Sequence, residues 1–257
     1  MCWNISSAEH LAAPLEPVRS LWVGGVLPAA NRACIASFLR VGHPFALFVY
    51  DAVEGFPAGT RLRRADQIVP RERVFRYGPA AGRGEGGLSG FSNLFRYALL
   101  LREGGYWVDT DVFCLRPFPT GEVIVASERG RNGRPMPTSC VLRCPAGSTF
   151  ARYCYERSLK ANPATLMHGQ IGPALVASAV RQPDFTGVVV SPDVFCGVNW
   201  YDHTSLCGCG ALAPGASGVH LWAEMWRRWN GEIPWPGPPG SALHQLAGMV
   251  EGEVGVA

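Results

Sequence analysis

The sequence has very little lysine, no run of basic residues and no long apolar stretch. Lys160 is the only lysine among 257 residues, and the formal net charge is only +3. Nothing in this charge pattern indicates a nucleic-acid surface, so no nucleic-acid partner is expected. No apolar run is long enough to cross a bilayer, which predicts a chain without a transmembrane segment and leaves peripheral membrane contact open.

Cysteine is present, but without the paired Cys-x-x-Cys spacing that is typical of structural zinc. The nine cysteines are scattered along the chain: Cys2, Cys34, Cys114, Cys140, Cys144, Cys154, Cys196, Cys207 and Cys209. An odd, scattered set with no signal-peptide pattern predicts reduced thiols and a cytoplasmic location. A zinc site at the pairs Cys140/Cys144 or Cys207/Cys209 is the weaker alternative.

Length and composition predict one folded domain over residues 1–257. Apolar residues make up 47% of the chain and charged residues 17%, which excludes wholesale disorder. A chain of this length buries a substantial core.

The pattern of residues 89–118 predicts a helix that ends at two glycines, followed by a short buried strand with two acids after it. Five apolar residues follow helical spacing between 91 and 99, and Ser89 is the expected N-cap. Gly104 and Gly105 favour a left-handed helix stop. Residues 106–108 then suit a short interior strand, and Asp109 and Asp111 follow it.

Two neighbouring carboxylates need a compensating charge. Like charges about 4 Å apart repel by roughly 4 kcal/mol at an effective dielectric near 20. A divalent cation held by Asp109, Asp111 and a substrate phosphate would replace this repulsion with a net attraction. An isolated Asp-x-Asp is more often a solvated turn, so the surrounding helix, glycines and aromatic strand carry the metal hypothesis.

Residues 92–97 (SNLFRY) and 104–112 (GGYWVDTDV) resemble the DXD sugar-nucleotide region of the glycosyltransferase family that includes the Och1-type mannosyltransferases. Related bacterial capsular and toxin-type transferases share this region. The resemblance implies an α/β, GT-A-like fold, with a Rossmann-like central mixed sheet flanked by helices and the DXD motif at a strand end. It also implies a UDP- or GDP-sugar donor, Mn²⁺ or Mg²⁺, and retention of anomeric configuration.

The resemblance also assigns roles to individual residues. Asp109 and Asp111 would act through the metal, and Asp109 would also reach the donor ribose or sugar. Asn93 and Arg96 occupy the helix positions that contact donor-sugar hydroxyls. Asn93 replaces the usual aspartate, so the sugar cannot be inferred.

The N-terminal part predicts a strand–helix–strand unit. Its segments are a strand and glycine loop within 20–28, a helix over 29–41 and a strand over 44–51. The resemblance places a segment like the first one beside the nucleotide. Trp22 would stack on a base and Gly24 and Gly25 would let the backbone approach it, or they form a core tryptophan and a tight turn. Asp51 would contact base or ribose, or cap the next element.

The remaining elements are expected from local pattern alone. They are a short helix or strand within 61–69, a flexible loop over 77–87, a strand over 123–126, a polar loop over 129–137 that would meet an acceptor, a strand over 139–142, helices over 148–159 and 174–180, short strands over 188–190 and 193–196, and an irregular loop over 201–210.

Two later segments resemble further parts of the family pattern. His168 and Gln170 precede a Gly-Pro helix start and are candidate substrate contacts, although structural roles are more common for such residues. His220 would be the third protein ligand to the cation, beside Trp222, which would cover the site; the alternative is a structural histidine among tryptophans.

The sequence therefore predicts a metal-dependent glycosyltransferase that moves a sugar from a nucleotide-sugar donor to a glycan, lipid-linked or other acceptor. Residues 20–118 would form the nucleotide-sugar half, 119–230 the acceptor side and 231–257 a tail. The alternatives are a catalytically degenerate relative that binds nucleotide or a partner, and an Asp-x-Asp phosphatase, for which Lys160 is the only available lysine.

Overall fold

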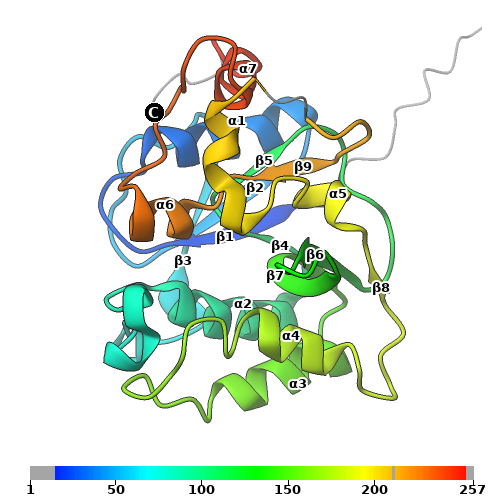
Figure 1. The fold of residues 1–257 in the computed structure, drawn as a ribbon. Coiled ribbons are helices and arrows are strands. Elements are labelled where there is room, and N and C mark those ends of the chain that lie inside the picture. The colour runs from blue at the N-terminus through cyan, green and yellow to red at the C-terminus, as the bar shows by residue number, and fades with distance from the viewer. Residues whose placement is uncertain (1–14, 210–211, 253–257) are drawn as a thin grey trace, which may run out of the picture.

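The computed structural model describes residues 15–209 and 212–252, built around a seven-stranded mixed sheet (Figure 1). In spatial order the strands are β3 (Arg61–Arg64), β2 (Phe45–Val49), β1 (Val18–Trp22), β4 (Gly105–Val108), β7 (Pro135–Cys144), β6 (Ile124–Arg129) and β8 (Val188–Val189). The first four are parallel, β7 runs antiparallel to both neighbours, and β6 and β8 are parallel.

Alternating side chains of the central strands supply two apolar cores, because successive residues of a strand face opposite sides of the sheet. On β4, Trp107 packs with the helices below the sheet, and Tyr106 and Val108 pack on the opposite face. The lower layer in Figure 1 is α2 (Ser89–Glu103), α3 (Thr149–Ser158) and α4 (Pro173–Ala179).

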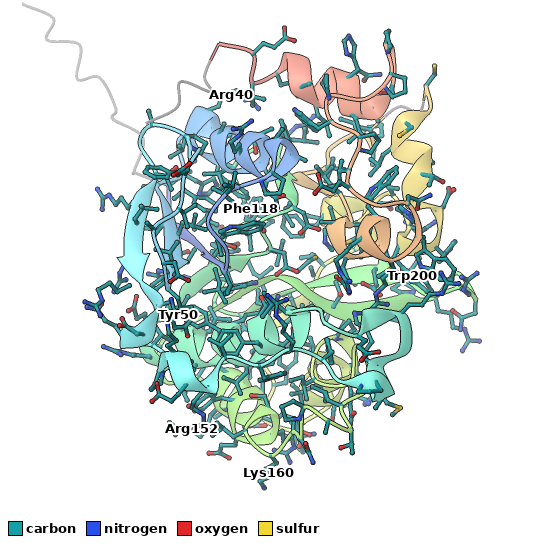
Figure 2. The ribbon with its side chains drawn as sticks, turned by 90° about the vertical axis from the view of Figure 1, so that its left-hand side faces the viewer. Arg40, Tyr50, Phe118, Arg152, Lys160 and Trp200 are labelled. Atoms are coloured by element: carbon teal, nitrogen blue, oxygen red, sulfur yellow. The ribbon has the colours of Figure 1, made fainter. Side chains whose placement is uncertain are left out.

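The upper layer begins with α1 (Ala29–Val41), which connects β1 to its parallel neighbour β2. The same side of the main sheet also carries a two-stranded sheet of β5 (Val112–Cys114) and β9 (Gly218–His220), with α5 (Pro192–Phe195), α6 (Ala223–Trp229) and, at the top of Figure 1, α7 (Ala242–Gly248). Figure 2 shows Phe118 in the interior beneath α1, whereas Arg152 and Lys160 lie on the outer surface.

The part of the chain that the structure describes also contains short 3₁₀ segments: η1 (Ala65–Gln67), η2 (Arg71–Arg73), η3 (Pro79–Gly84) and η4 (Trp200–Cys207). Within the described residues, no helix has the length and apolar character needed to cross a membrane.

The strand order places a ligand crevice between β1 and β4. The chain leaves β1 toward β2 on one side and later returns to β4 on the other, which makes a topological switch point. Ligands of open α/β sheets bind at the carboxyl ends of such strands. Trp22 ends β1, and Asp109 follows β4 at the same sheet edge.

The predicted α/β class, with a central mixed sheet flanked by helices and the DXD motif after a strand, is confirmed. The strand–helix–strand unit and the helix over 89–103 are also confirmed. Gly104 and Gly105 have φ values of 63° and 76°, and a side chain on Gly104 would meet the backbone of Ala146 at 2.3 Å. Glycine is therefore required at this helix stop.

Ser89 is not the N-cap that the sequence suggested. Leu88 occupies the cap position with φ −100° and ψ −2°, so the backbone is already helical before Ser89, and no side chain caps the helix. The expected loop over 77–87 contains the 3₁₀ turn η3, and Tyr77 and Gly87 are joined by a backbone hydrogen bond of 3.0 Å.

Three local expectations in the second half of the chain are wrong. Residues 129–137 are not one long loop, because β6 and β7 pair as far as Arg129 and Pro135 and leave a tight turn at Gly130–Arg134. Residues 193–196 are not a strand: Ser191 caps Asp193 N and Pro192 begins the helix α5. Of the expected irregular loop over 201–210, residues 201–207 belong to the 3₁₀ helix η4, and residue 210 lies outside the described residues.

Candidate functional site

Asp109 is fixed by the strand that precedes it and by the helix packed beneath that strand. Its backbone N–H donates to Cys140 O at 2.8 Å, and its Oδ1 accepts from Trp107 Nε1 at 3.0 Å. The guanidinium of Arg96 makes an ion pair with the same Oδ1. Oδ2 of Asp109 is left without a hydrogen bond among the described residues.

Arg96 is buried, and its guanidinium group donates to two partners. One nitrogen donates to Asp109, the other donates to Asn93 Oδ1, and the guanidinium carbon lies 4.9 Å from the centre of the Trp107 ring. Asn93 Oδ1 also accepts from Ser139 Oγ at 3.1 Å. A side chain on Gly172 would meet Asn93 Nδ2 at 2.9 Å, so the Gly-Pro start of α4 leaves room for this amide.

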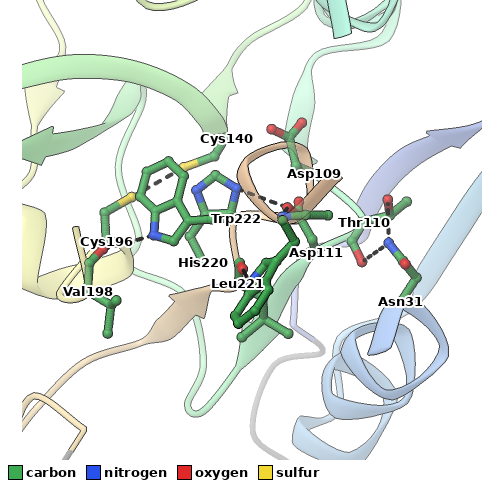
Figure 3. Close-up of polar contacts among 12 residues, drawn as sticks. Asn31, Asp109, Thr110, Asp111, Cys140, Cys196, Val198, His220, Leu221 and Trp222 are labelled. Atoms are coloured by element: carbon green, nitrogen blue, oxygen red, sulfur yellow. Dashed lines mark hydrogen bonds and ion pairs between the residues drawn. The ribbon is translucent and has the colours of Figure 1, made fainter. Parts of the chain in front are cut away.

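Asp111 joins the strand end to the C-terminal part of the chain (Figure 3). Its Oδ2 accepts from Ala223 N at 2.7 Å and lies 3.3 Å from His220 Nε2. Trp222, between them, has φ 61°, a left-handed conformation that costs a bulky residue of order 1–3 kcal/mol. This turn carries the chain from β9 into α6 and points Ala223 N–H at the carboxylate.

The pKa values of the two acids are shifted in opposite directions from their ordinary values. Burial raises the pKa of Asp109, the Arg96 charge opposes that rise, and the neighbouring Asp111 adds to it, so the net pKa lies above the ordinary value. Burial also acts to raise the pKa of Asp111, but His220 and the Ala223 N–H outweigh it and hold the pKa below its usual range. Asp111 is therefore the more firmly ionised of the pair.

These side chains line one cavity of about 870 Å³ at the switch point. One wall, the α2–β4 wall, comes from α2 and β4, and the floor comes from β6 and β7. The opposite wall, the α6 wall, comes from α6 and the segment that follows it. The volume is ample for a nucleotide-sized ligand.

Residues 89–130 match the family described as "Glycosyltransferase sugar-binding region containing DXD motif". This segment of the chain is similar to a DXD glycosyltransferase region. The match supports a glycosyltransferase at the level of enzyme class and implies donor and acceptor substrates. No curated protein sequence matches the chain.

Several solved structures are similar in part. The PaToxG glycosyltransferase has 12% identity and a TM-score of 0.46, over 67% of this chain and 72% of that chain. The YGT toxin glycosyltransferase domain has 10% identity and a TM-score of 0.43, over 65% and 78%. The catalytic domain of alpha-toxin from Clostridium novyi has 8% identity and a TM-score of 0.36, over 91% and 76%. These values carry no conclusion about function.

The metal-ligating atoms of this site fit a hard divalent cation. Ligand atoms of Asp109, Asp111 and His220 all lie within 4.8 Å of one another. Each carboxylate has one oxygen engaged in the protein, which leaves Asp109 Oδ2 and Asp111 Oδ1 for a metal. Carboxylate oxygens with an imidazole suit Mn²⁺, and Mg²⁺ is the harder alternative.

Most of the predicted site residues line the cavity. Around the DXD region these are Trp22, Asn93, Arg96, Asp109, Asp111, His168, His220 and Trp222. Gly24, Gly25, Asp51 and Gln170 are not among the lining residues. Asp51 is exposed and pairs with Arg71. A side chain on Gly24 would lie 3.3 Å from Trp22 Nε1, so this glycine makes room for the indole.

Sequence reasoning missed several lining residues on the floor and the opposite wall. Glu128 and Thr138 lie on the floor, and Glu224, Arg227, Arg228, Glu232 and Trp235 on the opposite wall. Burial raises the pKa of Glu128, and a hydrogen bond from Thr138 partly offsets this. The one signal in the sequence was Glu128 itself, an acid that follows closely on the apolar run of β6. The opposite wall has no local signature, because it comes from a segment more than 100 residues from the DXD region.

The phosphatase alternative lacks a phosphate-binding lysine at the site. Lys160, the only lysine of the sequence, is exposed beyond α3 and is not among the cavity-lining residues.

Proposed function

We propose that this chain is a metal-dependent, GT-A-like hexosyltransferase that uses a UDP- or GDP-sugar and retains anomeric configuration. The observation that carries the proposal is the carboxylate pair Asp109 and Asp111, each with one free oxygen, at the carboxyl end of β4 inside the cavity. Mn²⁺ or Mg²⁺ held there by the two acids and His220 would neutralise negative charge on the departing diphosphate.

The donor would occupy the side of the cavity nearest β1 and α2. Trp22 is half-buried there, and its buried Nε1 has no hydrogen-bond partner among the described residues, so the ring is available for stacking or donation. Arg96 holds Asp109 in place from below, and Asn93 faces the sugar position. Residues 20–118 would thus form the donor half of a single domain.

The transfer exchanges one bond at the anomeric carbon for another. The bond from that carbon to the diphosphate oxygen breaks with its electrons on the diphosphate. An acceptor hydroxyl oxygen attacks from the leaving-group face and gives its proton to the departing diphosphate oxygen. This attack would preserve configuration without a protein nucleophile or base. Asp109 and Arg96 orient the donor, and Trp222 covers the reacting end and excludes water.

The acceptor would enter from the wall formed by α6 and residues 231–235. This wall combines arginines, acids and Trp235, a composition that suits a polar glycan, a lipid-linked sugar or another hydroxyl-bearing acceptor. A cytoplasmic enzyme of polysaccharide synthesis would fit this arrangement, and peripheral contact with a membrane would fit a lipid-linked acceptor.

Calorimetric titration of UDP, GDP and their common sugar conjugates, with and without Mn²⁺, tests the proposal. We expect one sugar nucleotide to bind only with the metal, and Asp111→Asn to abolish that binding while the fold is retained. Metal-independent binding would contradict the assigned site. Metal-dependent binding without transfer to any acceptor would favour the catalytically degenerate alternative.

A further inference from the structure

A second group of metal-ligating side chains adjoins the DXD region and uses softer atoms. Cys140 on β7, Cys196 directly after α5 and His220 at the end of β9 bring their ligand atoms within 4.8 Å of one another. All three are buried, with exposed fractions of 2%, 1% and 7%. Figure 3 shows the imidazole between the two thiols and Asp111.

The sulfur separation matches that of two thiolates on one tetrahedral metal. Cys140 Sγ and Cys196 Sγ lie 3.6 Å apart. With metal–sulfur bonds of about 2.3 Å, tetrahedral coordination places two sulfurs roughly 3.8 Å apart, whereas a disulfide needs about 2.05 Å. Two packed thiols without a metal would show a similar separation, so the distance alone does not decide.

The decisive second feature is the imidazole. The His220 side chain is only 9% exposed, and its Nδ1 is buried with no nitrogen or oxygen partner among the described residues, so the thiol of Cys140 is the one side chain there that it can engage. Its other nitrogen, Nε2, lies 3.3 Å from Asp111 Oδ2. A metal-ligating histidine commonly donates its second N–H to a carboxylate, which fixes the ring and strengthens the ligand. Asp111 and His220 already have that relation.

We propose that Cys140 Sγ, Cys196 Sγ and His220 Nδ1 form a binding site for a thiophilic divalent cation such as Zn²⁺. Each thiol releases its proton to solvent as its sulfur–metal bond forms, and the imidazole proton resides on Nε2, where it donates to Asp111. Cys140 and His220 line the cavity, so the cation reaches the site from there and leaves a fourth position for water.

This site competes with the hard-metal site for His220. A neutral imidazole has one nitrogen lone pair, so it binds a metal through Nδ1 or through Nε2 but not both. A thiophilic cation on Nδ1 therefore removes His220 from the Asp109–Asp111 set. Resting on the proposed function, the inference makes the soft site inhibitory toward metal-dependent binding of the sugar nucleotide.

Titration of the full chain with Cd²⁺ alone, followed by its ultraviolet thiolate charge-transfer band, tests the site without any nucleotide. We expect one Cd²⁺ per chain with a two-thiolate band, and at least tenfold weaker binding in Cys140→Ser and in Cys196→Ser. Cys154→Ser is the matched control, because Cys154 is an equally buried thiol outside the cluster. A band that persists in both cluster variants, or that disappears only when Cys207 and Cys209 are replaced, would overturn the proposal.

Co²⁺ substitution decides the matter on the unaltered chain if the serine variants fail to fold. Two thiolates give intense sulfur-to-cobalt charge transfer with tetrahedral d–d bands, whereas carboxylates and imidazole alone give weak bands. The weak spectrum would refute the soft site. If Co²⁺ shows the thiolate spectrum but Cd²⁺ leaves Mn²⁺-dependent nucleotide binding unchanged, the competition for His220 is wrong and the soft site stands.

Discussion

The two walls of the cavity are built on different physical principles. The α2–β4 wall (Asn93, Arg96, Trp107 and Asp109) comes from one short stretch of chain and is largely buried, and its polar groups are bonded to one another. The α6 wall (Glu224, Arg227, Arg228, Glu232 and Trp235) comes from a distant segment. It has exposed ion pairs, such as Arg227 with Glu224 at 2.8 Å.

This difference predicts two kinds of sensitivity. Buried, forked hydrogen bonds hold a fixed geometry, and losing one partner leaves a charge uncompensated. Exposed ion pairs are screened by solvent and salt and contribute at most about 1 kcal/mol each. Substitutions on the α2–β4 wall should therefore affect geometry and stability, whereas those on the α6 wall should affect affinity in a salt-dependent way.

Replacing Asp111, where the walls meet, should have the largest effect. Asp111→Asn keeps the side-chain shape and still accepts from Ala223 N, but it loses the charge that holds a cation and His220. We expect transfer to fall on the order of a thousandfold, about 4 kcal/mol. The chain should still fold, with a lowered melting temperature, because His220 loses its buried partner. Initial-rate assays with and without a chelator measure this, and a variant that retains chelator-sensitive turnover would refute the assignment.

Arg96→Ala should have the next largest effect, on stability and on binding. It leaves Asp109 without its ion-pair partner, which we expect to cost about 3 kcal/mol in the free energy of unfolding. Use of the sugar nucleotide should weaken more than binding of the free nucleotide. Urea denaturation and paired titrations of the two ligands measure these changes.

Arg96→Lys is the control for geometry against charge. Lysine keeps the positive charge, but it cannot reach Asn93 and Asp109 in a planar fork. Lysine should therefore restore part of the stability and little of the sugar discrimination. Full recovery of both by lysine would show that only charge matters on this wall.

The sequence was informative where neighbours in space are also neighbours along the chain. The helix period, the Gly104–Gly105 stop and the strand before Asp109 all lie within residues 89–111, so local spacing predicted these elements. The family resemblance, and not the spacing, placed Asn93 and Arg96 in one site with the acids, and Arg96 does contact Asp109. Even there, local spacing did not indicate that Arg96 is buried, because that burial depends on how the helix packs against the Trp107 ring of β4.

Prediction failed where long-range pairing decides the structure. The cavity lining from residues 231–235 and the contact between Cys140 and Cys196 join segments far apart in sequence. No local pattern encodes these contacts. The helix at Pro192 was a different kind of miss, because Ser191 and Pro192 form a recognisable start signal that the apolar residues after it obscured.

Arg228→Ala should have a moderate effect, confined to the α6 wall. Arg228 pairs with Glu224 at 2.9 Å, and its buried Nη2 has no partner among the described residues, which leaves a donor for a bound acceptor. We expect the acceptor KM to rise about tenfold, roughly 1.4 kcal/mol, with nucleotide binding changed less than about twofold. Kinetics at two salt concentrations provide the measurement. An equal loss of nucleotide affinity would place Arg228 on the donor side.

Asn93→Asp should have the smallest effect on stability and the most specific effect on function. The new carboxylate can still accept from Arg96 and Ser139, so the unfolding free energy should change by less than about 1 kcal/mol. It loses the amide donor beside Gly172 and adds a negative charge close to Asp109. A panel of UDP- and GDP-sugars should therefore show a changed order of preference. If the order of preference among the sugar nucleotides is unchanged in Asn93→Asp while Arg96→Ala alters it, Arg96 recognises the sugar and Asn93 serves only to hold the guanidinium in place.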